Sequence, residues 1–554
     1  MRAAQGQEPA DLVLTGGAVV DVFSEEIIEA DVAIVDGDIA GVGDYPEGRE
    51  RLDVSGRFVA PAFIDAHIHT ESALVWITEF ARAVVPRGTG AIVTDPHEIA
   101  HVAGLPGLQA MRDAAASLPL AVYFTAPSCV PASPMESPGA VFGPNEIAAT
   151  LAWPETVGLG ELMNFPGVLA GDDEIAHKLD VSRGRRRDGH APGLRGTALH
   201  AYVGSGPGSD HESTALEEAR DKLRAGMMVM IREGSSARNL AALLPLVTDH
   251  TYPRCCFCSD DRDCDLLLHR GHMDDILRQA IAGGLDPLRA IRLATWNAAD
   301  YWRLDGLGAV APGFRANLTI LDDLPAVAVG VTLHEGRVVA EHGRLTTPLP
   351  AADIPAWLRE TMRPAPLAVE ALRLAPAEAR QAVVVTGGQI ATGWEAVEPT
   401  VRGDWAAADP ARDLLKLVCV ERHHATGRVG VGYVRGFGLR RGALASSIAH
   451  DAHNIVAVGA DDADLLAAIV AVADMGGGLA AVADGEVVAQ LPLPVAGILS
   501  DQPLSAVAAR YAELEEAARA LGSGLPSPFG LLSFLALSVI PEARVTDWGF
   551  VRLG

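Results

Sequence analysis

Residues 11–60 alternate apolar and polar positions in short segments. Apolar side chains recur at every second position, as in residues 12–14 and 32–35. The segments are divided at Gly16-Gly17, Asp36-Gly37 and Ser55-Gly56. Alternation with period two is typical of β-strands, and glycine-containing pairs between such runs predict hairpin turns. We therefore expect a small antiparallel sheet in residues 1–60.

The pattern changes after Pro61, where strand-like apolar runs alternate with segments of helical periodicity. This alternation indicates parallel βα units. The strand-like runs lie at residues 62–69, 90–95, 121–126, 157–162, 186–190, 210–211, 227–232 and 255–260. Eight units over about 250 residues are what a closed (β/α)8 barrel requires. The expected fold class is thus α/β, with a TIM-like barrel at residues 61–306.

The remainder of the chain predicts three further parts. Residues 307–348 return to hairpin-like alternation and are expected to complete the sheet begun in residues 1–60, as one composite β-domain. The proline-bearing residues 349–366 are expected to be a linker. Residues 367–554 predict an additional C-terminal α/β domain, with a hairpin turning at Asp484-Gly485.

Composition narrows the function classes. Among 554 residues, 71 are acidic and 44 are Lys or Arg, which gives a formal charge of −27. Such a surface repels polyanions, so we expect no nucleic acid and no membrane as partner. The first twenty residues lack a secretory signal pattern, and no apolar window reaches the roughly 18–20 residues of a membrane span. A cytoplasmic location is therefore expected.

The cysteines predict no disulfide framework. Only six are present, and four of them crowd into residues 255–264. Secreted disulfide scaffolds distribute their cysteines along the chain. We expect these thiols to be reduced, small, buried apolar residues on the last barrel strand.

Two histidines leave the first barrel strand together. Period-two alternation predicts that Asp65, His67 and His69 share one face. In a barrel this face is the interior, which opens at the carboxyl end of the strand into the active-site mouth. Two ordinary surface histidines are the alternative, but apolar residues before a polar pair at a strand end fit a surface strand poorly.

Later strand ends supply more metal-binding groups. These are Glu161, His190, His211 and Asp260. Imidazole and carboxylate without thiolate suit a divalent first-row metal such as Fe, Mn, Zn or Co. Two metals bridged by a carboxylate would need about this many ligands while keeping a position open for water.

Several motifs, taken in their order along the chain, resemble those of a known protein family. They lie at residues 61–71, 94–98, 160–167, 188–194, 211–213, 231–235 and 258–262, and in the C-terminal stretch 436–459. Together they resemble the adenine deaminase family of the amidohydrolase superfamily. The likeness extends over nearly the whole chain, and the ordered set is far more specific than any one motif.

The resemblance implies a ligand set for two divalent metal ions, with Mn or Fe(II) foremost and Zn also accepted. His67 and His69 would hold one ion, and His190 and His211 would hold the other. Glu161 would bridge both ions, and Asp260 would bind the first ion and handle a proton.

Many amidohydrolases bridge their metals with a carboxylated lysine after the fourth strand. This chain has three lysines, Lys178, Lys222 and Lys416. None occupies that place, since Lys178 lies well beyond Glu161 in a segment that indicates helix or loop. A bridging glutamate matches the adenine deaminase branch.

The implied reaction is hydrolytic deamination of adenine to hypoxanthine and ammonia, a step of purine salvage. The implied partner is a small purine base, and the family likeness implies a homodimer. Asp260 would accept a proton from the attacking water. His97 would donate a proton to the ring or to the leaving ammonia, and a structural role at a proline-containing turn is its alternative.

Further residues are candidates for the pocket. Glu71 and Glu98 would hydrogen-bond the purine, or serve as helix N-terminal carboxylates. Arg232, Glu233 and Ser235 would line the pocket after the seventh strand. Residues 450–453 leave two interpretations open: a third metal site from His450, Asp451 and His453, or packing between domains or in a core.

Four other functions compete with adenine deamination. An N6-substituted adenine deaminase or a cyclic amide or imide hydrolase of the same superfamily would use the same ligands. A noncatalytic barrel would have no reason to carry all six groups. A zinc deaminase signature is nearly matched by His69-Thr70-Glu71 and residues 253–258, but Arg254 interrupts it and the spacing spans most of a barrel.

Overall fold

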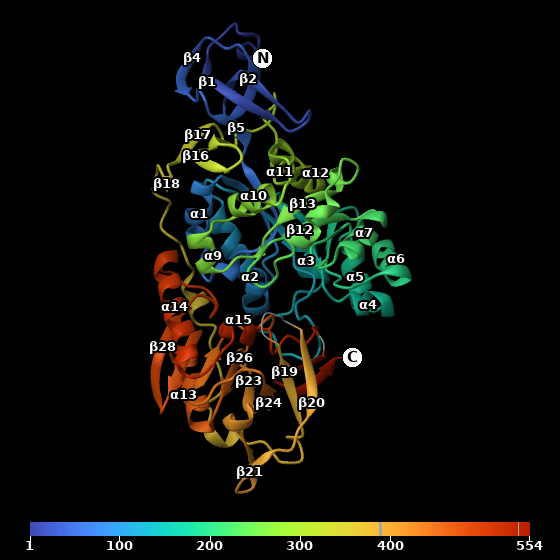
Figure 1. Cartoon of the computed structure of the whole chain (residues 1–554), viewed down its shortest axis with the longest axis vertical. Helices are drawn as coiled ribbons and strands as arrows, with labels where there is room; N and C mark the ends of the chain where they lie inside the picture. The colour runs from blue at the N-terminus through green and yellow to red at the C-terminus, as the bar shows by residue number, and fades with distance from the viewer. Residues whose placement is uncertain (387–390, 541, 554) are drawn as a thin grey trace.

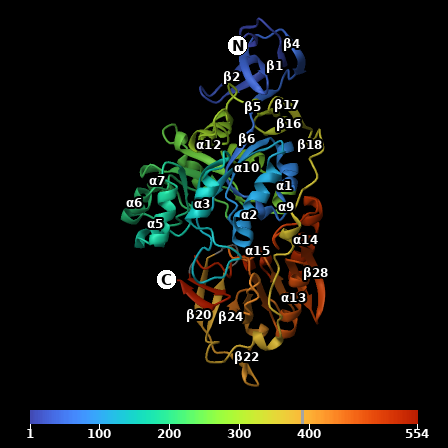
Figure 2. The ribbon, with the colours of Figure 1, turned by 180° about the vertical axis from the view of Figure 1, so that it is seen from behind.

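The computed structural model describes residues 1–386, 391–540 and 542–553. The molecule is elongated, with an N-terminal β-sheet at one end, an α/β barrel in the middle and the C-terminal domain at the other end (Figure 1). The view from behind shows the same order along the long axis (Figure 2).

A nine-stranded sheet takes its strands from both sides of the barrel sequence. Its first strands are β1 (Ala10–Asp21), β2 (Glu26–Val35), β3 (Asp38–Gly43), β4 (Gly48–Asp53) and β5 (Phe58–Pro61). The later ones are β15 (Leu318–Asp323), β16 (Ala328–His334), β17 (Arg337–Glu341) and β18 (Arg344–Leu345). Strand β15 pairs antiparallel with β5, which joins the two groups into one sheet.

One expected turn in this sheet is wrong. Strand β1 continues through Gly16 and Gly17, and its pairing with β2 shifts register between Leu14 and Gly17. Gly16 has a φ of 70°, a conformation that glycine adopts without steric cost. The glycine pair therefore makes a β-bulge inside a long strand, not a hairpin turn.

The barrel consists of parallel strands curled into a ring. They are β6 (Phe63–His69), β7 (Thr89–Thr94), β8 (Ala121–Ala126), β9 (Thr156–Leu162), β10 (Arg186–Gly189), β11 (Ser209–Asp210), β12 (Met228–Arg232), β13 (Cys255–Cys258) and β14 (Asp260–Asp261). One paired sheet has the order β10-β9-β8-β7-β6-β14, and a second has the order β11-β12-β13. Strand β10 lies beside β11 and β13 lies beside β6, which brings the ring together. The expected TIM-like barrel is confirmed.

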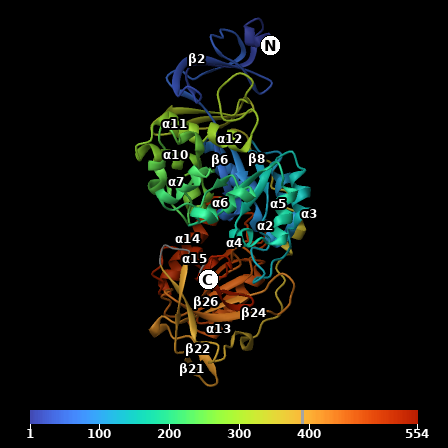
Figure 3. The same cartoon turned by 90° about the vertical axis from the view of Figure 1, so that its right-hand side faces the viewer.

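Helices surround this ring (Figure 3). They are α1 (Ile77–Val84), α2 (His97–Ala115), α3 (Pro144–Leu151), α4 (Phe165–Ala170), α5 (Asp173–Val181), α6 (Gly196–Ser205), α7 (Leu216–Arg224), α8 (Leu240–Leu243), α9 (Cys264–His269), α10 (Met273–Ala282), α11 (Pro287–Leu293) and α12 (Trp296–Trp302). Beneath the carboxyl strand ends, Ala66, Val93, Met230 and Cys256 pack with Trp302 of α12. The Trp302 indole N–H donates to the Ala66 carbonyl at 2.8 Å, so this large side chain is both buried and hydrogen-bonded.

A bulge in β6 changes the predicted faces of its residues. Asp65 pairs with Ile92 and Ile68 with Thr94, so β6 holds one residue more than β7 between these positions. Simple alternation is therefore lost between Asp65 and His67. The prediction that Asp65 shares the face of both histidines is wrong. Asp65 Oδ2 instead accepts a hydrogen bond from the Ser259 hydroxyl, at an O–O distance of 2.5 Å.

The C-terminal domain contains an eight-stranded sheet with the order β20-β19-β24-β23-β26-β25-β27-β28. The strands are β19 (Gln381–Val385), β20 (Thr392–Ala396), β23 (Leu415–Val420), β24 (Val429–Arg435), β25 (Ala443–Ser446), β26 (Ile455–Gly459), β27 (Gly478–Ala483) and β28 (Glu486–Pro492). Two small hairpins are β21 (Thr400–Arg402) with β22 (Trp405–Ala407) and β29 (Glu542–Thr546) with β30 (Gly549–Leu553). Helices α13 (Asp462–Asp474), α14 (Leu504–Ala520) and α15 (Pro528–Ser533) complete the domain.

The barrel and the C-terminal domain share one apolar core. Its buried members include Trp76 and Ile99 from the barrel side and Leu499 and Leu532 from the C-terminal side. The segment expected as a linker contributes Leu358, which is fully buried and whose carbonyl accepts the Ala496 N–H at 2.7 Å. These contacts fix the C-terminal domain against the barrel. Across residues 1–386, 391–540 and 542–553, no helix combines the length and apolar character needed to cross a bilayer.

Candidate metal centre

Six predicted ligand residues converge at the carboxyl ends of the barrel strands. His67 and His69 end β6, Glu161 lies near the end of β9, and Asp260 begins β14. His190 and His211 directly follow β10 and β11. The groups that could hold a cation include His67 with His69 and Glu161, His67 with His211 and Asp260, and Glu161 with His190 and His211.

Glu161 occupies the centre of this cluster. Its Oε1 lies 3.3 Å from His69 Nε2, and its Oε2 lies 2.5 Å from His190 Nδ1 and 3.2 Å from His211 Nε2. The two carboxylate oxygens thus face different histidines. This arrangement is the one that a carboxylate shared by two cations requires.

The other ring nitrogens of the β6 histidines are held by buried acceptors. His67 Nδ1 lies 2.6 Å from Asp188 Oδ2, and His69 Nδ1 lies 2.7 Å from the Asp95 carbonyl. A metal-binding imidazole characteristically donates its second N–H to such an acceptor, which leaves the opposite nitrogen with a free lone pair.

These lone pairs meet one another inside the cluster. His67 Nε2 and His69 Nε2 are 3.3 Å apart, and each lies 3.2 Å from Asp260 Oδ1. Three electron-rich atoms in van der Waals contact are satisfied by a positive charge between them. The residues present therefore fit a divalent cation, and the cluster is a candidate metal centre.

The local charges favour cation binding in a second way. Burial would raise the pKa of Glu161, but His190 and His211 outweigh burial and hold that pKa well below its usual range. Burial likewise opposes ionisation of Asp260, yet Arg232 and His67 keep its pKa low. Both groups are therefore carboxylates at neutral pH, the protonation state that binds a metal.

Arg232, the last residue of β12, forms ion pairs with Asp260 of the cluster and with two further carboxylates. Its guanidinium lies 2.5 Å from Asp260 Oδ2 and 2.7 Å from Asp261 Oδ1, and it also pairs with Glu212. Asp260, and not Asp261, faces the β6 histidines. Alternation with Cys256 and Cys258 predicts the same choice of Asp260, but the backbone between them is not a regular strand, because β13 ends at Cys258 and Asp260 has a φ of 60°.

His97 lies beside the cluster at the start of α2. Its ring stacks on His69 with centroids 4.3 Å apart, and its Nδ1 lies 3.3 Å from Glu161 Oε1. Burial disfavours a charged imidazole, but Glu98 and Asp451 outweigh burial and raise the pKa of His97 to about 10. These neighbouring carboxylates thus favour the protonated form of the His97 imidazole.

Glu71 and Glu98 are both buried near His97. Burial raises the pKa of Glu71 to about 7, and its Oε1 accepts the Ile99 N–H at 3.3 Å. Glu98 is bonded to His450 and His453 of the C-terminal domain. Glu71 thus keeps the capacity to exchange a proton near neutral pH, whereas both Glu98 oxygens are already engaged.

The structure does not bring Glu233 and Ser235 into the cluster. Glu233 Oε2 accepts the Leu240 N–H at 3.2 Å, and Ser235 Oγ accepts the Asp263 N–H at 2.8 Å. Both side chains therefore organise the loops after β12 and β14. Of the three residues expected to line the pocket from this segment, only Arg232 contacts a cluster residue in these interactions.

Sequence reasoning missed the acceptors behind the histidines. Asp188 is fully buried and serves His67, and Asp95 Oδ2 accepts the Glu161 N–H at 2.8 Å. A signal for Asp188 was present, because in the expected strand at residues 186–190 it stands two positions before His190, and regular alternation would place both on one face. The Asp95 interactions involve its own backbone carbonyl and a partner strand, for which the sequence carries no comparable signal.

The lysines and cysteines take no part in the cluster. Lys178 Nζ donates to the Ser128 carbonyl at 3.0 Å, and Lys222 Nζ pairs with Asp210 at 2.8 Å. The six cysteines are free and buried. Neither a carboxylated lysine nor a thiolate is placed to replace Glu161.

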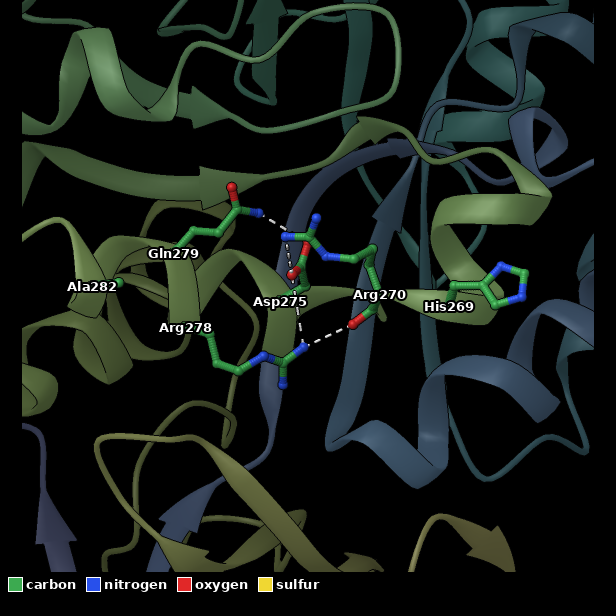
Figure 4. A pocket seen from close by; sticks show the side chains of 6 residues that line it. All are labelled: His269, Arg270, Asp275, Arg278, Gln279 and Ala282. Atoms are coloured by element: carbon green, nitrogen blue, oxygen red, sulfur yellow. Dashed lines mark hydrogen bonds and ion pairs between the residues drawn. The ribbon is translucent and has the colours of Figure 1, made fainter.

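A surface pocket between α9 and α10 shares no residue with the metal centre (Figure 4). Its polar groups satisfy one another: Gln279 Nε2 donates to Asp275 at 2.9 Å, and Arg278 donates to the Arg270 carbonyl at 2.8 Å. His269 points away from this network (Figure 4).

Comparison with known proteins adds independent information. Residues 58–344 match the amidohydrolase family, and residues 389–554 match the adenine deaminase C-terminal domain. A protein named adenine deaminase from Dehalococcoides mccartyi is 45% identical over 552 residues, covering 100% of this chain and 96% of that protein. The chain belongs to the adenine deaminase family.

Other members of the adenine deaminase family are equally similar. Adenine deaminase 2 of Carboxydothermus hydrogenoformans is 44% identical over 555 residues, with 100% of this chain and 97% of that protein covered. Among solved structures, a β-aspartyl dipeptidase of Fervidobacterium islandicum AW-1 aligns with a TM-score of 0.47 and 14% identity, over 61% of this chain and 98% of that one. Amidohydrolase membership and the ligand clusters together imply that this chain binds divalent metal.

Proposed function

We propose that this protein hydrolyses adenine to hypoxanthine and ammonia. The observation that carries the proposal is the convergence of four histidines with the carboxylates of Glu161 and Asp260, in a chain that aligns end to end with proteins named adenine deaminase. Histidine and carboxylate ligands without thiolate are suited to metal-assisted hydrolysis.

Two divalent cations would be held by this donor set. One cation would be bound by His67, His69 and Asp260. The other would be bound by His190 and His211, and Glu161 would bind both. Bound cations of this kind lower the pKa of water from 15.7 to about 7 and so supply a nucleophile at neutral pH. Mn(II) or Fe(II) is the proposed occupant, and Zn(II) is compatible with the same ligands.

The protein's own residues would manage the protons. Asp260 is the proposed acceptor of the proton released when oxygen attacks C6 of the purine, since it is ionised and adjoins both β6 histidines. Arg232 holds the second Asp260 oxygen and so orients the first toward the histidines. General-base catalysis by such a group typically contributes 10²–10⁴-fold to the rate.

His97 is the proposed donor to the leaving amine. Its raised pKa keeps it protonated, and its stacking on His69 holds it against the centre. Glu71, buried nearby with a pKa of about 7, is the proposed hydrogen-bond partner of the purine ring. A carboxyl group that titrates near neutrality can either donate to a ring nitrogen or accept from a ring N–H.

The direct test is an adenine assay on metal-loaded protein. Conversion to hypoxanthine is followed by the change in ultraviolet absorbance and by release of ammonia. Adenine and an N6-substituted adenine are compared at equal concentration, together with a cyclic imide. Preferential release of ammonia from adenine supports the proposal. Hydrolysis of the imide with adenine untouched contradicts it.

A further inference from the structure

Two histidines of the C-terminal domain bind Glu98 beside the metal centre. Glu98 Oε1 lies 2.5 Å from His450 Nδ1, and Glu98 Oε2 is bonded to His453 Nε2. Glu98 stands in the first turn of α2, whereas the histidines follow it by 352 and 355 residues. All three residues are largely buried, so this contact joins the two domains inside the protein.

A third metal site is the alternative to this hydrogen-bonded contact. The three ligand atoms do lie within 4.8 Å of one another. The 2.5 Å between Glu98 Oε1 and His450 Nδ1 is also a hydrogen-bond length, so the metal content of the variants described below separates the two interpretations.

This contact continues to the metal centre through His97. Glu98 Oε1 lies 3.5 Å from His97 Nε2, and His97 Nδ1 lies 3.3 Å from Glu161 Oε1. The sequence of contacts therefore runs from His450 and His453 through Glu98 to His97, and from His97 to the proposed bridging ligand. A displacement of Glu98 would release one side of the His97 ring.

The backbone around His453 is fixed from several directions. His453 has a φ of 54°, a left-handed conformation that is sterically disfavoured for a residue with a side chain. Arg422 is fully buried and its Nε donates to the His453 carbonyl. Asn454 Nδ2 donates to the Ser137 carbonyl across the domain boundary at 3.1 Å, and the Ser137 hydroxyl donates to Asp547 at 2.6 Å. The surrounding structure thus imposes the position of the imidazole.

We propose that the C-terminal domain positions the proton donor of the active site. His450 and His453 hold Glu98, and Glu98 orients His97 toward the leaving amine. Glu98 is accordingly a positioning residue and not a purine ligand. This inference rests on the proposed adenine hydrolysis, because it assigns the domain a part in that reaction.

Paired double variants test the proposal. His450→Leu with His453→Leu removes both donors to Glu98. His450→Asn with His453→Gln keeps an N–H near the Nδ1 and Nε2 positions, respectively. His424→Ala is the matched control, since His424 Nε2 makes a different cross-domain hydrogen bond, to the Pro138 carbonyl at 3.0 Å. Each protein is compared with wild type for kcat, KM and bound metal.

We expect the leucine pair to lose about 100-fold in kcat, in the range of general acid catalysis, with KM within about twofold of wild type. The asparagine and glutamine pair should recover at least about tenfold of that loss. His424→Ala should behave as wild type, and every variant should keep its full metal content. Equal losses in both pairs, or a wild-type rate in the leucine pair, would overturn the proposal. Loss of a bound ion from the leucine pair would instead identify a metal site.

A double-mutant cycle separates positioning of His97 from general damage. If the histidines act through His97, the leucine pair should lower kcat by less than about threefold further in a His97→Asn background. The effects of substituting residues that act as a unit are not additive. A full additional 100-fold loss would refute action through His97. Wild-type protein that leaves adenine unchanged overturns the proposed function and this inference together. Active wild type with insensitive variants overturns this inference alone.

Discussion

Replacing Asp188 by asparagine tests the metal centre through a residue that touches no metal in the proposed ligand set. Asp188 is fully buried, and its Oδ1 accepts the Ser209 hydroxyl proton at 2.5 Å and the Gly189 N–H at 2.9 Å. Asparagine preserves these two bonds through its carbonyl oxygen. It places an amide N–H₂ against His67 Nδ1, where the carboxylate oxygen lies at 2.6 Å.

The amide would oppose the His67 tautomer that exposes the Nε2 lone pair. Loss of such an outer acceptor typically weakens metal binding by about 10–100-fold, which is about 1.4–2.7 kcal/mol. Asp188 Oδ2 also faces His211 Nδ1, but the distance of 3.7 Å is too long for a strong hydrogen bond. The effect should therefore arise mainly at His67.

The assay is titration of metal-free protein with Mn(II) against a chelator of known affinity. We expect Asp188→Asn to bind at least one Mn(II) about 10–100-fold more weakly, with much of kcat recovered at saturating Mn(II). Asp464→Asn is the control, because Asp464 is buried and accepts the Gly485 N–H at 2.7 Å within the C-terminal domain. Wild-type Mn(II) affinity in Asp188→Asn would refute the reasoning.

Three more predictions follow from the same geometry. Glu161→Gln should lose at least one bound ion, measured by elemental analysis, and all measurable turnover. Full metal content together with a wild-type-like rate would contradict its bridging role. Asp260→Asn should keep its metal but lose at least about 100-fold in kcat, so an unchanged kcat would dismiss it as proton acceptor. Burial raises the pKa of Glu136 from 4.5 to about 8, so its stabilising contribution is complete below pH 4.5 and is lost as the pH rises through about 8. The midpoint temperature of thermal unfolding should therefore fall less for Glu136→Gln than for wild type between pH 6 and 9. Parallel plots of midpoint against pH would exclude this linkage.

The sequence predicted the barrel because its strands are buried runs of the right number and spacing. The expected strand at residues 121–126 has the same bounds as β8, and that at 157–162 differs from β9 by one residue. The bulge in β6 could not be predicted, since it depends on register against β7. A glycine pair likewise has no local property that distinguishes a bulge from a turn, as Gly16 and Gly17 show.

The candidate ligands could be predicted from the sequence because each donor stands at a strand end, where barrel topology brings side chains together. Roles that depend on folding between distant segments were not accessible. Glu98 reads locally as a helix N-terminal carboxylate, and only the docking of the C-terminal domain brings His450 and His453 to it. Glu233 and Ser235 stand after a strand end as the ligands do, and their side chains accept hydrogen bonds from the later residues Leu240 and Asp263, which local sequence does not indicate.

The most direct test of the account is the activity of metal-free protein during stepwise addition of Mn(II), with adenine as substrate. Turnover to hypoxanthine should rise with added metal and level off at two ions per chain, as a centre shared through Glu161 requires. A plateau at one ion per chain, or adenine that stays intact at full metal loading, would contradict it.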